Sequence, residues 1–144
     1  NLGYNELIGT TPSFLGNNLP SPAQLYLAGN YLTGTIPATL GNLLDLEILD
    51  LSYNQLIGTI PKSLYNLTNL ITLLLWVNGM TGSIPTVMGN LMYLTDLYLA
   101  WNNLTGSIPE SIGNLLQLTT LELEGTNLTG QLPPTLGKLS RLSD

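Results

Sequence analysis

The stretch NLTGSIPESIGNLLQL, residues 103–118, decides the fold, because the chain repeats it almost unchanged. Close copies are YLTGTIPATLGNLLDL at residues 31–46 and QLIGTIPKSLYNLTNL at residues 55–70. The glycine of the phrase recurs at intervals of 25, 24, 24, 24 and 24 residues, at Gly9, Gly34, Gly58, Gly82, Gly106 and Gly130. A fixed period of this length across a whole chain predicts a solenoid, in which each repeat buries its apolar side against its neighbours.

Within one repeat, the alternation of residues indicates a strand, and an asparagine marks its end. In LEILDLSYN, residues 46–54, Leu49 and Leu51 alternate with Asp50, which predicts a short strand with the leucines inward and Asp50 outward. Asn54 follows the strand, and its amide can both donate to and accept from the backbone of adjoining coils. We therefore expect a row of asparagines, one per coil, at this point of the solenoid.

The rest of the repeat carries the chain around the back of the coil. Gly58 permits a turn that a Cβ would obstruct, and Pro61 fixes the backbone without leaving an unpaired N–H. The apolar residues of this part are predicted to join the strand leucines in one continuous core; they are Leu56, Ile60, Leu64 and Leu67.

Composition excludes several classes of function. The 144 residues fit a single domain, and the 44% of apolar residues is ample for a core. Three Lys and Arg against nine Asp and Glu give a net charge of −6, which argues against nucleic acid or an anionic membrane as the main partner. No apolar run reaches about 18 residues, so we expect no direct membrane insertion in this segment. Histidine and cysteine are absent, and we expect neither a metal site nor a cofactor.

The repeat resembles the plant-type leucine-rich repeat, whose consensus is Leu-x-x-Leu-x-Leu-x-x-Asn-x-Leu-Thr-Gly-x-Ile-Pro-x-x-Leu-Gly-x-Leu. This family includes the ectodomains of receptor-like kinases and receptor-like proteins, and polygalacturonase-inhibiting proteins. The resemblance implies an α/β solenoid, a right-handed superhelix of about six repeats of 24 residues. It also implies a concave parallel β-sheet, 3-10 or irregular segments on the convex side, and binding through concave or lateral surfaces. The chain, residues 1–144 as one domain, departs from the family in Thr126, which replaces the strand-end asparagine, and in lacking recognisable caps.

Outward positions on the strands carry the candidate ligand-binding residues. Aromatic side chains are common anchors of protein and carbohydrate contacts, because they bury a large area with few rotatable bonds. The alternative is that these rings only cover neighbouring strands. The candidates are Tyr26, Tyr53, Trp76, Tyr98 and Trp101, together with Glu122 and Glu124.

Glu122 and Glu124 also invite a catalytic interpretation. Being two apart on a strand, they share a face at roughly 7 Å, near the separation of the carboxyl pairs of glycosidases. An open solenoid face offers no obvious burial to push their pKa values apart, as such a pair requires. A solvated face, or a docking site for a basic partner, is favoured, and we expect no enzymatic activity.

Three Asn-Leu-Thr sequons are present, although the repeat consensus itself generates this tripeptide. A surface this poor in charge needs another source of solubility, which glycans supply. We therefore predict an extracellular chain with N-linked glycans at Asn66, Asn103 and Asn127.

These observations predict a non-enzymatic extracellular module that recognises a protein, a peptide or a glycan through its concave face. The alternative is a glycosylated structural filament of chains stacked head to tail. Leu2 at one end, with Leu139 and Leu142 at the other, would then form the apolar junction, because we expect these leucines to lie bare.

Overall fold

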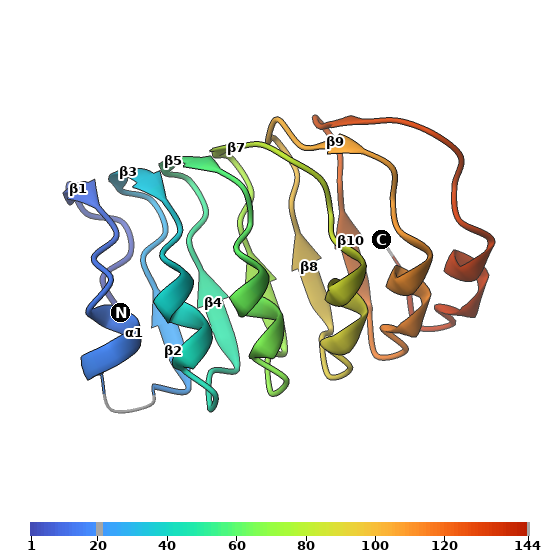
Figure 1. The fold of residues 1–144 in the computed structure, drawn as a ribbon, viewed down its shortest axis with the longest axis horizontal. Coiled ribbons are helices and arrows are strands. Elements are labelled where there is room, and N and C mark those ends of the chain that lie inside the picture. The colour runs from blue at the N-terminus through green and yellow to red at the C-terminus, as the bar shows by residue number, and fades with distance from the viewer. Residues whose placement is uncertain (20–21, 144) are drawn as a thin grey trace.

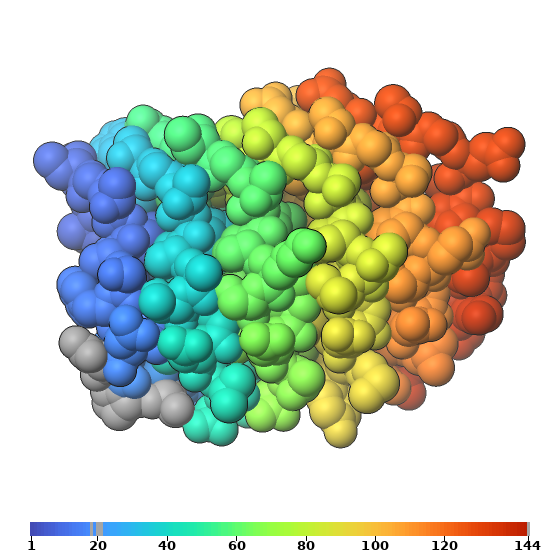
Figure 2. All heavy atoms as spheres, in the orientation of Figure 1, coloured from blue at the N-terminus to red at the C-terminus, as the bar shows by residue number. Residues whose placement is uncertain are grey.

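Successive coils of the chain lie side by side along the long axis of the molecule (Figures 1 and 2). The computed structural model describes residues 1–19 and 22–143. Each coil runs from a strand at one side of the molecule, through a second short strand, to a helical turn on the opposite side. The leucine-rich-repeat solenoid predicted from the sequence is confirmed.

The first sheet has five parallel strands in the order β10-β8-β6-β4-β2, and we call it the concave sheet. Its strands are β2 (Gln24–Tyr26), β4 (Ile48–Asp50), β6 (Thr72–Leu74), β8 (Asp96–Tyr98) and β10 (Thr120–Glu122). The register places equivalent residues of successive repeats side by side, so that Leu49 lies between Leu25 and Leu73. Leu49 and Leu51 are fully buried and Asp50 is half-buried, as the alternation predicts.

Further parallel strands pair along one edge of the solenoid, in two separate sheets that we together call the second sheet; the sequence pattern did not predict them. Four strands pair in the order β1-β3-β5-β7, and two more pair as β11-β9. They are β1 (Ile8–Thr10), β3 (Tyr31–Thr35), β5 (Gln55–Gly58), β7 (Gly79–Met80), β9 (Thr105–Gly106) and β11 (Asn127–Leu128). Gly58 has a φ of +77°, and a Cβ there would lie 2.9 Å from the methyl group of Thr35. The repeated glycine therefore lets neighbouring coils approach within this sheet.

The convex side consists of one short α-helix and a row of 3-10 turns (Figure 1). They are α1 (Leu15–Asn18), η1 (Ala38–Asn42), η2 (Lys62–Asn66), η3 (Thr86–Asn90), η4 (Glu110–Asn114) and η5 (Pro134–Lys138). Close stacking here depends on glycine, since a Cβ at Gly41 would clash with the carbonyl oxygen of Ser63. The Ser63 hydroxyl also donates to the carbonyl of Ala38 in the preceding turn, at 2.7 Å.

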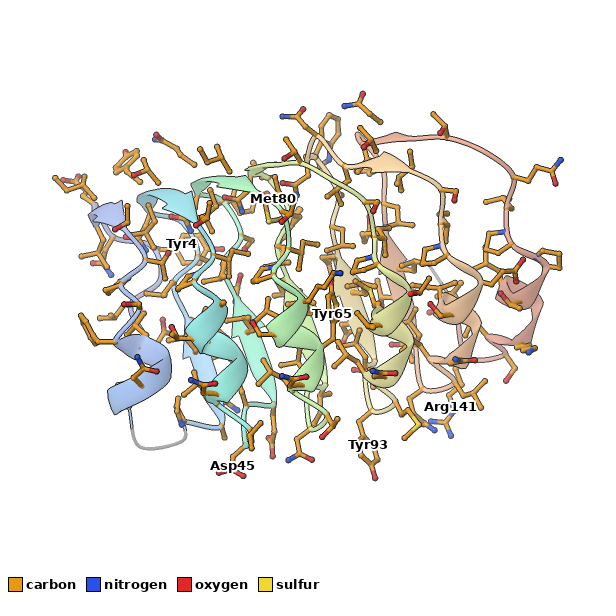
Figure 3. All side chains as sticks on the ribbon, in the orientation of Figure 1. Tyr4, Asp45, Tyr65, Met80, Tyr93 and Arg141 are labelled. Atoms are coloured by element: carbon orange, nitrogen blue, oxygen red, sulfur yellow. The ribbon has the colours of Figure 1, made fainter. Side chains whose placement is uncertain are left out.

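Tyr65 interrupts this glycine row, because it occupies in η2 the place that Gly41 and Gly89 hold in η1 and η3. The equivalent glycines face the next turn, so the Tyr65 ring lies on the η3 side of η2 (Figure 3). The phenol is buried and its hydroxyl has no hydrogen-bond partner among the described residues. Burial raises the pKa of the Tyr65 phenol, because the phenolate would lose its hydration.

One apolar core runs through all the coils, as the leucine pattern predicts. Leu56, Leu64 and Leu67 are fully buried and Ile60 is 5% exposed. Strand-end asparagines connect each coil to its neighbours; we call Asn30, Asn54, Asn78 and Asn102 the asparagine ladder. Asn54, for example, donates to the carbonyls of Leu27, Leu51 and Ser52 and accepts from the amide of Leu32.

The two ends differ from the expectation of bare leucines. Leu2 is 53% exposed, as expected, but Leu139 is only 5% exposed and belongs to the core. Leu142 is half-buried and packs against that core. The expectation for Leu139 was wrong because this residue completes the inner face of its own coil, directly after η5, instead of opening a new one. Stacking of copies head to tail stays a prediction.

Among the described residues, no helix has the length and apolar character needed to cross a membrane. The connection between the first two repeats, where the sequence carries its one extra residue, includes Pro20 and Ser21, which lie outside the described residues.

Candidate ligand-binding face

Strand-end residues of the concave sheet are held in a left-handed backbone conformation. Tyr53, Val77 and Trp101 have φ values of +50°, +54° and +54°, and Gly29 and Gly125 occupy the same place in other coils. This conformation is unusual for non-glycine residues, above all for a β-branched one such as Val77, and persists only when the surroundings enforce it. Each following asparagine enforces it, because its side chain binds the strand carbonyls around the turn. Where this residue is aromatic, its ring extends toward the next coil, as the Tyr53 ring does toward Trp76 and the Trp101 ring toward Gly125.

Three of the candidate residues form one aromatic cluster across neighbouring strands. The ring centroids of Tyr53 and Trp76 are 4.8 Å apart at 66°, an edge-to-face arrangement. Those of Trp76 and Tyr98 are 5.9 Å apart at 51°. Tyr53 is 41% exposed, while Trp76 and Tyr98 are half-buried. Each contact of this kind contributes roughly 0.5–1.5 kcal/mol, so the rings hold one another in place on the sheet.

A groove of about 450 Å³ lies on the concave sheet beside this cluster. Its lining combines aromatic, apolar and carboxylate groups from β6, β8 and the residue two places beyond β6; the lining residues are Thr72, Leu74, Trp76, Asp96 and Tyr98. Asp96 is oriented by the hydroxyls of Thr95 and Thr72, which donate to its Oδ2 at 2.7 and 3.3 Å. The groove therefore offers a fixed carboxylate at one end and aromatic rings at the other.

Trp101 forms a separate unit with the next coil. Its indole Nε1 donates to Glu124 at 3.0 Å, and a Cβ at Gly125 would come within 2.7 Å of its ring. The ring therefore lies over the glycine backbone, just as the Tyr4 ring lies over Gly29. Trp101 remains 56% exposed, so it both covers its neighbour and presents an apolar surface.

The remaining candidates stand apart from both units. Tyr26 is half-buried on β2, where its hydroxyl lies 3.5 Å from the side-chain oxygen of Gln24. Glu122 is half-buried at the end of β10, and Glu124 is exposed and engaged by the Trp101 indole. Glu122 ends β10, whereas Glu124 lies in the turn beyond it and is bound by the Trp101 indole, so a shared face for the two carboxylates stays a prediction. In the described part of the chain, no group of three or more His, Cys, Asp or Glu residues is placed to hold a metal ion.

An exposed apolar surface that was not predicted from the sequence lies on the edge where the concave strands begin. We call it the edge patch, and its large apolar residues are Leu44, Ile71, Met92, Tyr93 and Leu116. A shallow pocket of about 790 Å³ lies within it, bordered also by Glu47 and Gln117. Figure 3 shows Tyr93 projecting from this edge. Exposed apolar surface of this kind is typical of contacts with another protein. Part of its signal in the sequence was the apolar residue that follows the Asn-Leu pair at the end of three 3-10 turns, namely Leu44, Met92 and Leu116.

The three sequon asparagines, Asn66, Asn103 and Asn127, are all exposed. Asn66 ends η2 on the convex side, while Asn103 and Asn127 lie along the second sheet. Glycans at these places would leave the concave sheet open. Attachment of sugar stays a prediction.

Comparison with known families gives matches over most of the chain. Models described as leucine rich repeat match residues 23–80, and also residues 93–115 and 117–139. Among curated proteins, a segment of 50 residues is 40% identical to the LRR receptor-like serine/threonine-protein kinase EFR of Arabidopsis thaliana. That match covers 35% of this chain and 5% of the kinase.

Solved structures of plant receptors are similar to nearly the whole chain. The plant peptide hormone receptor RGFR1, in complex with RGF2, matches 96% of this chain with a TM-score of 0.93 and 39% identity. The PEPR1-AtPEP1 structure matches 99% of it with a TM-score of 0.92 and 40% identity. This chain spans only 22% and 20% of the lengths of those two receptor chains.

Proposed function

The chain belongs to the plant-type leucine-rich-repeat family, and we propose that it is a non-enzymatic recognition module that binds an extended peptide along its concave sheet. The family's fold is one scaffold with many partners, so the assignment rests on the site. We further propose an extracellular location for it, with glycans on the three exposed sequon asparagines. The relatives that support this location are a plant peptide hormone receptor and a receptor-like kinase.

The aromatic cluster of Tyr53, Trp76 and Tyr98 is the single observation that carries the proposal. The core beneath it is complete without these rings, because Leu73, Leu75, Leu97 and Leu99 are already fully buried. The rings therefore leave apolar area in contact with water that a ligand can cover. Aromatic residues clustered near the centre of a binding face are the usual energetic anchors of an interface.

The shape of the concave sheet favours an extended ligand. Outward residues of successive strands form continuous rows across the five strands, such as the row from Tyr26 through Asp50, Leu74 and Tyr98 to Glu122. A peptide crossing the strands meets one repeat after another, and its side chains can be read in turn. One similar structure is that of a plant peptide hormone receptor in complex with RGF2, which supports a peptide as the ligand class.

Selection of peptides on the intact chain tests the proposal. Peptides of about twelve residues are selected from a random display library, and their affinities are measured by fluorescence polarisation for the parent and for two tyrosine variants. Tyr98→Ala should weaken binding at least about fivefold, or roughly 1 kcal/mol. Tyr31→Ala is the matched control, because Tyr31 is an exposed tyrosine on β3 in the second sheet. Selected peptides that bind Tyr98→Ala as tightly as the parent would contradict binding at the cluster.

A further inference from the structure

Resting on the proposed function, we infer that the groove between β6 and β8 recognises an arginine side chain of the bound peptide. The groove combines an oriented carboxylate, an apolar floor and two aromatic rings within one pocket on the concave sheet. None of these features alone specifies a ligand. Together they match the two parts of an arginine side chain, which are the charged fork and the aliphatic stem.

The concave sheet is negatively charged. The charged residues on the concave sheet and at its strand ends are all acidic: Asp50, Asp96, Glu122 and Glu124. All three basic residues lie elsewhere, with Lys62 in η2, Lys138 in η5 and Arg141 beyond η5. No cation of the protein therefore neutralises Asp96 from within the sheet. A ligand with a positive side chain supplies the missing charge, whereas a ligand carboxylate would meet repulsion.

The hydrogen bonds of Asp96 identify which oxygen is available. Its Oδ2 accepts from the hydroxyls of Thr95 and Thr72, and these two bonds fix the plane of the carboxylate. In the described part of the chain, Oδ1 has no hydrogen-bond donor. Asp50 differs, because its carboxylate is turned toward its own strand, where Oδ1 accepts from both the amide and the hydroxyl of Ser52. Each acid keeps one oxygen without a donor among the described residues, and of the two only Asp96 lines the groove.

The spacing of the groove suits a long side chain that lies along the strand. Asp96 pairs with Thr72, and Tyr98 pairs with Leu74 two residues further on, roughly 7 Å along the strand. An arginine stem can therefore rest on Leu74 while its guanidinium reaches Asp96. The Trp76 and Tyr98 rings, whose centroids are 5.9 Å apart, offer π faces at the other end. These rings and Leu74 cover the aliphatic stem of the arginine, which packs against apolar surface while its charged head stays at Asp96.

A pair of peptides that differ only in charge tests this inference. The probes are acetyl-Ala-Ala-Arg-Ala-Ala-amide and its counterpart with citrulline, which keeps the shape of arginine but is neutral. Binding is followed through the indole N–H signals in a ¹⁵N-labelled chain, and Trp101→Phe assigns the two tryptophans. We expect a saturable shift of the Trp76 signal, with the arginine peptide binding at least about fivefold more tightly than the citrulline peptide.

Asp96→Asn should reduce that preference to about one, because it removes the charge and keeps the oxygen that the threonines bind. Glu110→Gln is the matched control, an exposed acid in η4 on the convex side, and should retain the full preference. Equal binding of the two peptides to the parent, or an unchanged preference in Asp96→Asn, would overturn the arginine site. So would a Trp76 signal that neither peptide moves. If the selected peptides bind at the concave sheet but lack arginine, the arginine site is overturned and the proposed function stands. If the selected peptides bind Tyr98→Ala as tightly as the parent chain, the proposed function itself is contradicted.

Discussion

The coils with an asparagine at the strand end differ sharply from the last full coil, which has Thr126 in its place. Asn102 is 3% exposed, donates to the carbonyls of Leu75, Leu99 and Ala100, and accepts from the amide of Met80. Thr126 makes one such bond, to the carbonyl of Leu123 within its own coil. The asparagine connects two neighbouring coils and its own turn, whereas the threonine stays local.

The amide of Leu104 shows the consequence. The equivalent amides in the other coils, at Leu7, Leu32, Leu56 and Met80, each donate to the side-chain oxygen of a ladder asparagine. No side-chain acceptor for Leu104 is found in the described part of the chain. The short threonine hydroxyl cannot span two coils. The ladder therefore depends on the length of the asparagine side chain and not only on the presence of a polar group.

Loss of a complete ladder residue should have the largest effect. Asn102→Ala leaves several buried backbone groups without partners, and we expect the free energy of unfolding to fall by about 2–3 kcal/mol. Urea denaturation followed by circular dichroism measures the loss. Asn90→Ala, at an exposed asparagine in η3, is the control and should change stability by less than about 0.5 kcal/mol. Similar losses of unfolding free energy in the two variants would contradict the stabilising role of the asparagine ladder.

Restoring the ladder in the last coil should have a smaller effect of opposite sign. Thr126→Asn provides an acceptor for the Leu104 amide and donors for strand carbonyls, and we expect a gain of about 1 kcal/mol. The same denaturation experiment applies, with Thr86→Asn at an exposed position of η3 as the control for the change of residue type. A Thr126→Asn variant that is no more stable than the parent chain would show that something other than the missing amide limits this coil.

Removal of the threonine hydroxyl should have the smallest effect. Thr126→Ala loses one hydrogen bond to a carbonyl in a half-buried setting, so we expect a cost of about 0.5–1 kcal/mol. The loss in free energy of unfolding for Thr126→Ala, compared with that for Asn102→Ala, separates the contribution of one local hydrogen bond from that of a hydrogen-bond network between coils. Equal costs at the two positions would contradict the ladder explanation.

Much of the fold follows from local repetition and is therefore readable in the sequence. The 24-residue period, the inward leucines and the asparagine row are all confirmed, because each depends on contacts between identical positions of neighbouring coils. Thr126 was recognisable as a departure for the same reason. The second sheet was missed because its strands are short and their glycine weakens the signal of a strand.

The candidate site was only partly predictable. Aligning the repeats placed Tyr53, Trp76 and Tyr98 on outward positions, but not in contact with one another. It also did not show that Trp101 lies over Gly125 and binds Glu124, or that Leu139 returns to the core. These outcomes depend on non-equivalent residues of neighbouring coils, about which the repeat pattern gives no information.

The repeat pattern of the amino-acid sequence specifies the repeating backbone: which residues face inward, where each coil turns, and how successive coils are joined. Only the tertiary structure decided which outward side chains meet, including the aromatic cluster, the groove ending at Asp96 and the edge patch. The reason is that the core repeats with one period, so each inward side chain packs against the equivalent side chains of the neighbouring coils. An outward side chain can contact any of several neighbours. The left-handed turn at each strand end and the size of the residue in the adjoining coil determine which contact forms.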